Sequence, residues 1–262
     1  MSKWTFDPLA YQVGWRSFGV DHPHYPFQYR PTSETMDEYE RECLTAAQRF
    51  QSQLDDDLYW AFVTMLNPEA RIYACGFTGP GEAEKVRAYV AVRGPHAVLM
   101  RQDPGPDHGC GGTVHLSRLP HGRCGDAIAH ALPTVDPGRR PRIDVDMRDL
   151  ENEPEDEFAT PTSWLHEQST QATPKQELEQ LLDLPRVGVG RVEVYSGATI
   201  GARDTVRVRE VRWVDVADDG RYLVASSPRT VSAIPGRDDA LSTLVQKLVA
   251  AATEESRSEV AV

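Results

Sequence analysis

The sequence predicts a mixed α/β (α+β) protein that arose by internal duplication. Along the 262 residues, the hydrophobic pattern changes twice from the three- or four-residue spacing typical of helices to the alternation typical of strands. Each strand-rich stretch then ends in a Pro/Gly turn that leads into a further helix. A diverged duplication explains this repeated order better than coincidence does.

The N-terminal region is expected to be mostly helical. Residues 7–18 carry apolar side chains near helical spacing and are compatible with a helix or a first strand. Residues 22–31 contain three prolines, which favour an extended path over the core. An amphipathic helix is predicted to begin after Ser33, its expected N-cap, and a second helix begins at Asp55 and ends before Pro68.

The middle of the chain has the composition of a strand meander. Four strands are predicted, at 72–77, 86–92, 97–100 and 113–116. The Gly94-Pro95 pair marks a tight hairpin between the second and third of these strands. Pro120 then leads into a helical segment over 126–132.

The C-terminal half repeats this order after an acidic tract. Six carboxylates fall within residues 149–157, and their mutual repulsion predicts a solvated linker. A helix is expected over 175–183, and a closing helix is expected after Gly236. Between these two helices, strands are expected at 190–195, 205–209, 211–216, 221–225 and 230–234. The expected boundaries within this single domain are a first half over about 1–148, a linker over 149–161, a second half over 162–254 and a frayed tail over 255–262.

The overall charge limits the classes of partner. With 40 acidic and 28 basic residues the formal net charge is −12, so the average field repels nucleic acid and anionic lipid. The N-terminus lacks a basic segment followed by an apolar stretch, and no stretch approaches the ~20 apolar residues of a membrane span. We therefore expect a cytoplasmic protein with no nucleic-acid partner and no membrane insertion. Its four scattered cysteines are expected to be free thiols.

The strongest candidates for a metal or catalytic site lie in one Cys/His-rich stretch. It comprises His108, Cys110, His115, His121 and Cys124, and thiolate and imidazole are ligands that zinc prefers. Structural zinc sites pair ligands roughly two to four residues apart in two clusters, whereas here only His108 and Cys110 are close. The spacing therefore favours a Gly-rich hairpin loop without metal, cofactor or catalytic residue. A metal- or thiol-dependent enzyme centred on Cys110, His108 and His115 is the alternative.

Three stretches of the chain follow one another in an informative order. The first stretch, residues 4–50, contains an apolar opening, then an aromatic and proline-rich segment, then a Glu-rich helix. The second, residues 55–77, contains a short helix that passes into a strand. The third runs from Gly220 through Pro235 to the closing helix. In this order, together with the duplication, the chain resembles the EspG family of type VII secretion (ESX) chaperones from actinobacteria.

The resemblance implies both a fold and a function. The fold would be a central, mainly antiparallel β-sheet flanked by two helical bundles with quasi-two-fold symmetry. The function would be that of a cytosolic chaperone, not an enzyme, that binds the apolar tip of the PPE subunit in a helical PE/PPE pair. Such a chaperone keeps its client pair soluble and directs it to export. The implied partners are therefore a helical secreted protein pair and components of the secretion machine.

We predict that the client binds on the strands of the second half. Strands 206–216 and 221–225 mix aromatic, apolar and charged side chains, which suits an interface with an apolar centre and a polar rim. The resemblance implies the same region, because sheet and C-terminal bundle surfaces face the client in that family. The predicted contact residues are Arg207, Arg209, Val211, Arg212, Trp213, Val214 and Tyr222. A buried core position for Trp213 is the alternative, and a nucleic-acid regulator that uses the arginine strand is a weaker third interpretation.

Overall fold

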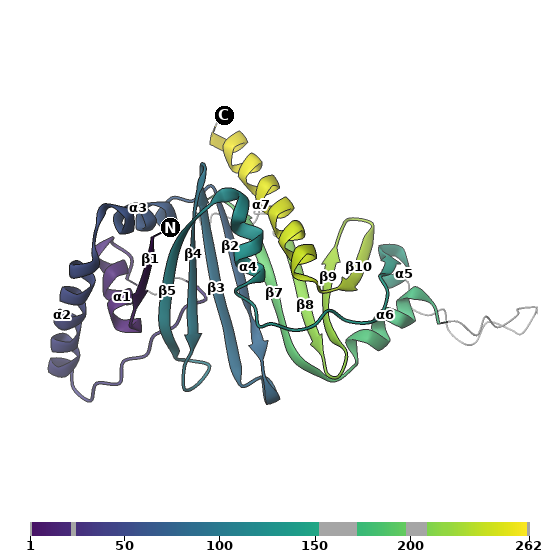
Figure 1. The fold of residues 1–262 in the computed structure, drawn as a ribbon, viewed down its shortest axis with the longest axis horizontal. Coiled ribbons are helices and arrows are strands. Elements are labelled where there is room, and N and C mark those ends of the chain that lie inside the picture. The colour runs from purple at the N-terminus through teal and green to yellow at the C-terminus, as the bar shows by residue number, and fades with distance from the viewer. Residues whose placement is uncertain (1, 22–24, 152–171, 198–208, 261–262) are drawn as a thin grey trace, which may run out of the picture.

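A computed structural model describes residues 2–21, 25–151, 172–197 and 209–260 of the chain. These residues form one ten-stranded sheet in the order β1-β5-β4-β3-β2-β7-β8-β9-β10-β6 (Figure 1). Every neighbouring pair of strands is antiparallel, which confirms the predicted fold class. The strands are β1 (Lys3–Phe6), β2 (Ala70–Thr78), β3 (Glu84–Arg93), β4 (His96–Pro104), β5 (Gly111–Pro120), β6 (Ile143–Asp146), β7 (Arg186–Ser196), β8 (Arg209–Val216), β9 (Gly220–Ser226) and β10 (Thr230–Pro235).

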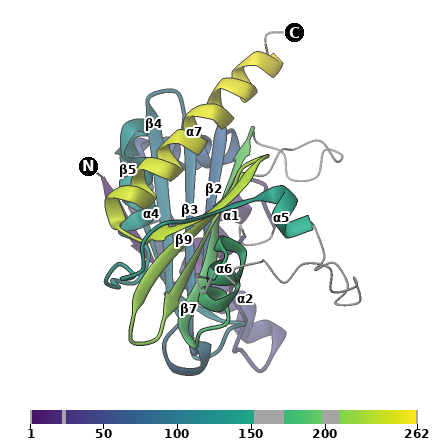
Figure 2. The same ribbon diagram turned by 90° about the vertical axis from the view of Figure 1, so that its right-hand side faces the viewer.

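Helices cover both faces of this sheet. In the described part of the chain they are α1 (Pro8–Ser17), α2 (Met36–Gln53), α3 (Asp56–Leu66), α4 (Cys124–Ala129), α5 (Met147–Glu151), α6 (Pro174–Leu182) and α7 (Asp238–Val260). Figures 1 and 2 show α4 and α7 on one face, here called the α7 face. The other face, here called the bundle face, carries α1–α3 at one end of the sheet and α5–α6 at the other (Figure 2). The two helical groups thus flank the sheet as the resemblance implies.

The order of elements repeats once along the chain. The first half runs from β1 through α1–α3 and the meander β2–β5 to α4, and the second runs from β6 through α5–α6 and the meander β7–β10 to α7. In each half the opening strand pairs with the last strand of its own meander. The halves join where β2 pairs with β7. Both halves therefore share the same strand order, whereas their coordinate superposition stays a prediction.

The predicted boundaries of the two halves need correction. β6 and α5 lie in the range assigned to the first half, yet β6 pairs with β10 of the second half. The second half therefore begins before Ile143. The tail predicted to fray at 255–262 instead continues α7 as far as Val260. The acidic linker lies outside the described residues from position 152 on, and its first residues end α5.

Alternating side chains divide the core between the two faces. On the α7 face, Val192 of β7 and Leu223 of β9 share a buried cluster with Val245 of α7. On the bundle face, Tyr89 of β3 packs in a separate buried cluster with Phe62 of α3. This arrangement follows from the two-residue period of strands, which makes each strand of a doubly covered sheet apolar on both sides.

The helix starts are set by side-chain caps. Asp7 and Asp55 accept hydrogen bonds from the third backbone N–H beyond them, at 2.8 Å and 2.7 Å, and so cap α1 and α3. Ser33 was the expected cap of α2, but this expectation is wrong. Thr35 caps that helix instead, because its hydroxyl accepts from the Glu38 N–H at 3.2 Å. Among the described residues, no helix combines the length and apolar character that crossing a membrane requires.

Candidate partner-binding surface

Strand alternation separates the residues predicted to bind a client. Val211 and Trp213 of β8 point to the α7 face and join its buried cluster. Arg209 has the same parity, and its guanidinium pairs with Glu255 of α7 at 2.9 Å. Val214 has the opposite parity and packs on the bundle face in the cluster that includes α6. The predicted mixture of side chains on one surface is therefore wrong for these residues.

Burial corrects the prediction further for the four apolar and aromatic members. Their exposed fractions are 2% for Val211, 1% for Trp213, 6% for Val214 and 1% for Tyr222. The hydroxyl of Tyr222 donates to Asp219 at 2.7 Å and accepts from a backbone N–H at 2.9 Å. These side chains are core residues of this chain and present no surface to a partner. Arg207 lies outside the described residues.

Arg212 is the member of the predicted set that remains exposed on the bundle face. Its side chain is 67% exposed and forms an ion pair with Glu210, two residues earlier on the same strand. In the register of the sheet, Arg212 lies beside Arg191 of β7, and Arg191 lies beside Cys75 of β2. Side chains at paired positions share a face. Cys75, Arg191, Glu210 and Arg212 therefore form one continuous strip, here called the central surface.

The central surface carries both signs of charge. The Arg191 side chain is 49% exposed and lies 3.3 Å from Glu193, which is nearly buried. The carboxylate of Glu193 raises the pKa of Arg191 above its usual value, so this guanidinium is charged at every physiological pH. Glu193 in turn lies opposite Glu210 of β8 in the register. Rows of opposite charge thus run side by side across β7 and β8.

The sequence did not indicate Arg191 and Glu193 as site residues. Each is an ordinary strand residue whose neighbours on other strands become known only from the register of β2, β7 and β8. The one usable signal was the interrupted valine pattern at Glu210 and Arg212, which marks charged positions on an otherwise apolar strand. That signal points to Glu210 and Arg212 and not to the residues of β7.

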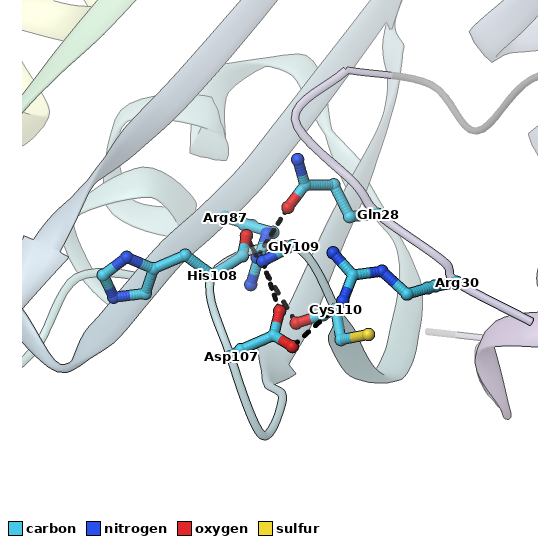
Figure 3. A network of polar contacts seen from close by, with 7 residues as sticks. All are labelled: Gln28, Arg30, Arg87, Asp107, His108, Gly109 and Cys110. Carbon is cyan, nitrogen blue, oxygen red and sulfur yellow. Dashed lines mark hydrogen bonds and ion pairs between the residues drawn. The ribbon is translucent and has the colours of Figure 1, made fainter. Parts of the chain in front are cut away.

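The Cys/His-rich loop does not assemble a catalytic site. Nε2 of His108 lies 3.2 Å from the Ala83 carbonyl oxygen, and its ring packs on Phe77 at 5.0 Å. Nε2 of His115 lies 2.9 Å from a carboxylate oxygen of Asp103. Figure 3 shows the His108 ring pointing away from Cys110. Both imidazoles thus contact groups other than the Cys110 thiol. The enzyme alternative is therefore not supported.

The other two potential ligands are also separated from this loop. The His121 ring lies 3.2 Å from the Gly94 carbonyl oxygen, and Cys124 is fully buried in the cluster under α7. Burial raises the pKa of the Cys124 thiol to about 12, so this cysteine stays protonated and is a poor metal ligand. Within the described residues, no three His, Cys, Asp or Glu side chains are grouped closely enough to hold a metal ion.

Chelator treatment tests this conclusion directly. Incubation with EDTA is expected to leave the melting temperature unchanged, because none of the expected ligands is spaced or oriented for a shared metal. Differential scanning fluorimetry with and without chelator measures the effect. A fall of several degrees, reversed by added zinc, would mean that a metal contributes to the fold.

A search of curated protein sequences returns no match. Among solved structures, the chain is similar to the Mycobacterium tuberculosis type VII secretion system chaperone EspG5 in complex with a PE25-PPE41 dimer. The TM-score is 0.58 at 12% sequence identity, over 96% of each chain, which shows a shared fold. The sequence model of the EspG family matches residues 7–247, which is most of the chain, and this protein therefore belongs to the EspG family.

Proposed function

We propose that this chain is a cytoplasmic, non-catalytic secretion chaperone that binds the apolar tip of a helical PE/PPE-type pair. It keeps the pair soluble and directs it to a type VII secretion system. Membership of the EspG family over residues 7–247 carries this proposal. The solved EspG5 structure, which contains a PE25-PPE41 dimer, supports a client of the same kind for this chain. Such a chaperone acts stoichiometrically, by covering an apolar patch that otherwise aggregates.

The central surface is the proposed client-binding site. It lies on the bundle face between the two helical groups, and its exposed arginines are the residue type enriched at protein interfaces. Phe77 lies opposite Val189 in the register, so both side chains belong to the next row of the same face. Both are half-buried. A charged strip beside apolar side chains matches an apolar client tip surrounded by polar residues.

Charge reversal at Arg212 tests this site. The Arg212→Glu variant is expected to weaken binding of a PE/PPE-type pair by about tenfold or more, because it places a third carboxylate beside Glu210 and Glu193 and removes a donor from the interface. The client pair is chosen first, as the PE/PPE-type pair of the source organism that the unmodified chain binds most tightly on co-expression. Its affinity for each variant is then measured by biolayer interferometry.

Arg237→Glu is the matched control for Arg212→Glu. Arg237 is 68% exposed and pairs with Asp239 two residues away, so the change in charge and in local pairing is the same. It precedes α7, which covers the opposite face. If both variants weaken binding equally, the cause is the change in overall charge, and a site at Arg212 is contradicted. If no PE/PPE-type pair binds the unmodified chain, the proposed function itself is wrong.

A further inference from the structure

A segment over residues 25–30, which begins with a turn at 25–26, runs from the edge of the central surface to the tip of the β4–β5 hairpin. Its middle residue, Gln28, is held through its backbone. The Gln28 N–H donates to Oε1 of Gln102 at 2.9 Å, and Nε2 of Gln102 donates back to the Gln28 carbonyl at 2.8 Å. The Gly111 N–H donates to the same carbonyl at 3.1 Å. Buried amide-to-backbone pairs of this kind hold a segment in a single position.

A buried arginine joins the same segment to the sheet. Arg87 of β3 is 2% exposed, and Figure 3 shows its guanidinium between Gln28 and the hairpin tip. Nη2 of Arg87 donates to Oε1 of Gln28 at 3.0 Å and to the His108 carbonyl at 2.9 Å. The Arg87 atoms Nε and Nη1 have no hydrogen-bond partner among the described residues. The acceptors that Nη2 does have, on Gln28 and His108, therefore contribute to holding this segment against the sheet, because an unpaired buried donor costs about 1–3 kcal/mol.

The polar contacts are reinforced by an apolar anchor. Phe27 is 3% exposed and packs against Tyr11 of α1 with ring centroids 5.8 Å apart. Arg30 and Asp107 add an exposed ion pair at 3.3 Å, which contributes little by itself. With Phe27 in the core and Gln28 bonded on both sides, the segment has little freedom to move.

The consequence of this fixation is the position of Tyr25. Its side chain is 46% exposed, and its ring packs on Tyr73 of β2 with centroids 5.5 Å apart. The Tyr25 side chain lies close enough to the Cys75 thiol and the Arg191 guanidinium, which are both parts of the central surface, for both groups to influence its pKa. Burial is the main cause that raises the pKa of Tyr25, so the phenol stays protonated as a donor.

We infer that Tyr25 is a client-contact residue, and that Gln28, Gln102 and Arg87 are positioning residues that hold it at the edge of the central surface. The inference rests on the proposed function. An aromatic side chain that is already fixed loses little conformational entropy on binding, and tyrosine is enriched among residues that dominate interfaces. The client site is then composite: Arg191 and Arg212 come from the second half and Tyr25 from the first.

The chain offers a close control for this tyrosine. Tyr59 of α3 is 48% exposed and belongs to a separate exposed aromatic group, in which its ring lies 5.8 Å from that of Trp60. Tyr25→Ala and Tyr59→Ala remove the same side chain at nearly the same exposure. The α3 group is the rival docking surface, so the pair of variants compares the two sites directly.

Affinity for the PE/PPE-type pair held by the unmodified chain is the readout. Tyr25→Ala is expected to weaken binding by at least about tenfold, and Tyr59→Ala by less than about twofold. Binding unchanged by Tyr25→Ala, or weakened only by Tyr59→Ala, overturns the inference and leaves the proposed function standing. If the unmodified chain binds no such pair, the proposed function fails and the inference fails with it.

A double-mutant cycle separates positioning from general destabilisation. Gln102→Ala removes both bonds to the Gln28 backbone and is expected to weaken binding several-fold, and adding Tyr25→Ala to it should cause less loss than in the unmodified chain, because Tyr25 is already misplaced. Melting temperatures of all variants, measured in parallel, identify any that fail to fold. If the losses from Gln102→Ala and Tyr25→Ala simply multiply, Gln102 does not act through Tyr25 and its positioning role is wrong.

Discussion

Replacing Trp213 with alanine is expected to lower the free energy of unfolding by about 3–5 kcal/mol, the usual cost of removing a large buried aromatic side chain. The indole is 1% exposed and lies against Gly76 and Gly190, where added Cβ atoms would approach it to 2.6 Å and 2.2 Å. Two strands thus use glycine to admit one ring. The rigid neighbouring backbone cannot collapse into the cavity that alanine leaves.

Urea unfolding followed by circular dichroism measures this effect. The midpoint is expected to fall at an unchanged m-value, together with a drop of roughly 10 °C in Tm for a chain of this size. Trp60→Ala is the matched control, because Trp60 is 57% exposed on α3 and its loss should change stability by no more than about 0.5 kcal/mol. Equal costs for Trp213→Ala and Trp60→Ala would contradict the core position of Trp213.

Replacing Asp215 with alanine is expected to cost a further large amount, about 3–5 kcal/mol, because it leaves a buried arginine without its counter-charge. Nε and Nη2 of Arg221 donate to the two carboxylate oxygens of Asp215 at 2.6 Å and 2.8 Å. Their side chains are only 2% and 1% exposed, so water cannot replace the lost partner. The pair joins β8 to β9 at a register position where both residues face inward.

Two comparisons make this second prediction specific. Asp239→Ala removes one partner of an exposed ion pair and is expected to cost far less than Asp215→Ala, because solvent screens exposed charges. The double variant Asp215→Leu with Arg221→Met removes both buried charges and should be less destabilised than Asp215→Ala alone. Chemical denaturation measures all three. A double variant as unstable as Asp215→Ala would show that packing, and not the unpaired charge, is the cause.

The candidate site lies where the two halves of the molecule meet. The halves join through β2 and β7, and on the bundle face the helices of each half cover the strands nearer its own edge. Cys75 and Arg191 are contributed by these two joining strands, with Arg212 on the next strand. The pairing of β2 with β7 thus creates a surface that neither half possesses alone. The proposed client site is accordingly composite, with Tyr25 from the first half and arginines from the second.

Much of the element order could be predicted from the sequence. The helices α2, α3, α4, α6 and α7 and the meander strands were indicated by their hydrophobic periods, and the structure confirms them within a few residues, apart from the strand predicted at 205–209, which lies outside the described residues up to position 208. Two edge strands were missed. β1 and β6 have four residues each, which is too short for an alternating pattern to stand out. Their pairing with β5 and β10 is a long-range choice that local sequence does not encode.

The site was only partly predictable. The interrupted pattern on β8 correctly indicated charged positions, but Trp213 and Val214 were placed on a common surface although the period of a strand separates them. The enrichment of Trp and Arg at interfaces favoured an exposed Trp213. In the structure its ring is buried in the core, in the space left by the missing side chains of Gly76 and Gly190. No local pattern reveals those glycines as its neighbours.

The sequence by itself determined the period of each segment, the repeated order of elements and the resemblance to the EspG family, because these depend on residues near one another in the chain. Only the tertiary structure decided which face each strand residue occupies in a sheet covered on both sides. It also decided that Cys75 and Arg191 are neighbours on the sheet and that Tyr25 packs beside them on Tyr73. The physical reason is that register between strands is selected by packing over the whole sheet, so contacts across it depend on distant parts of the chain.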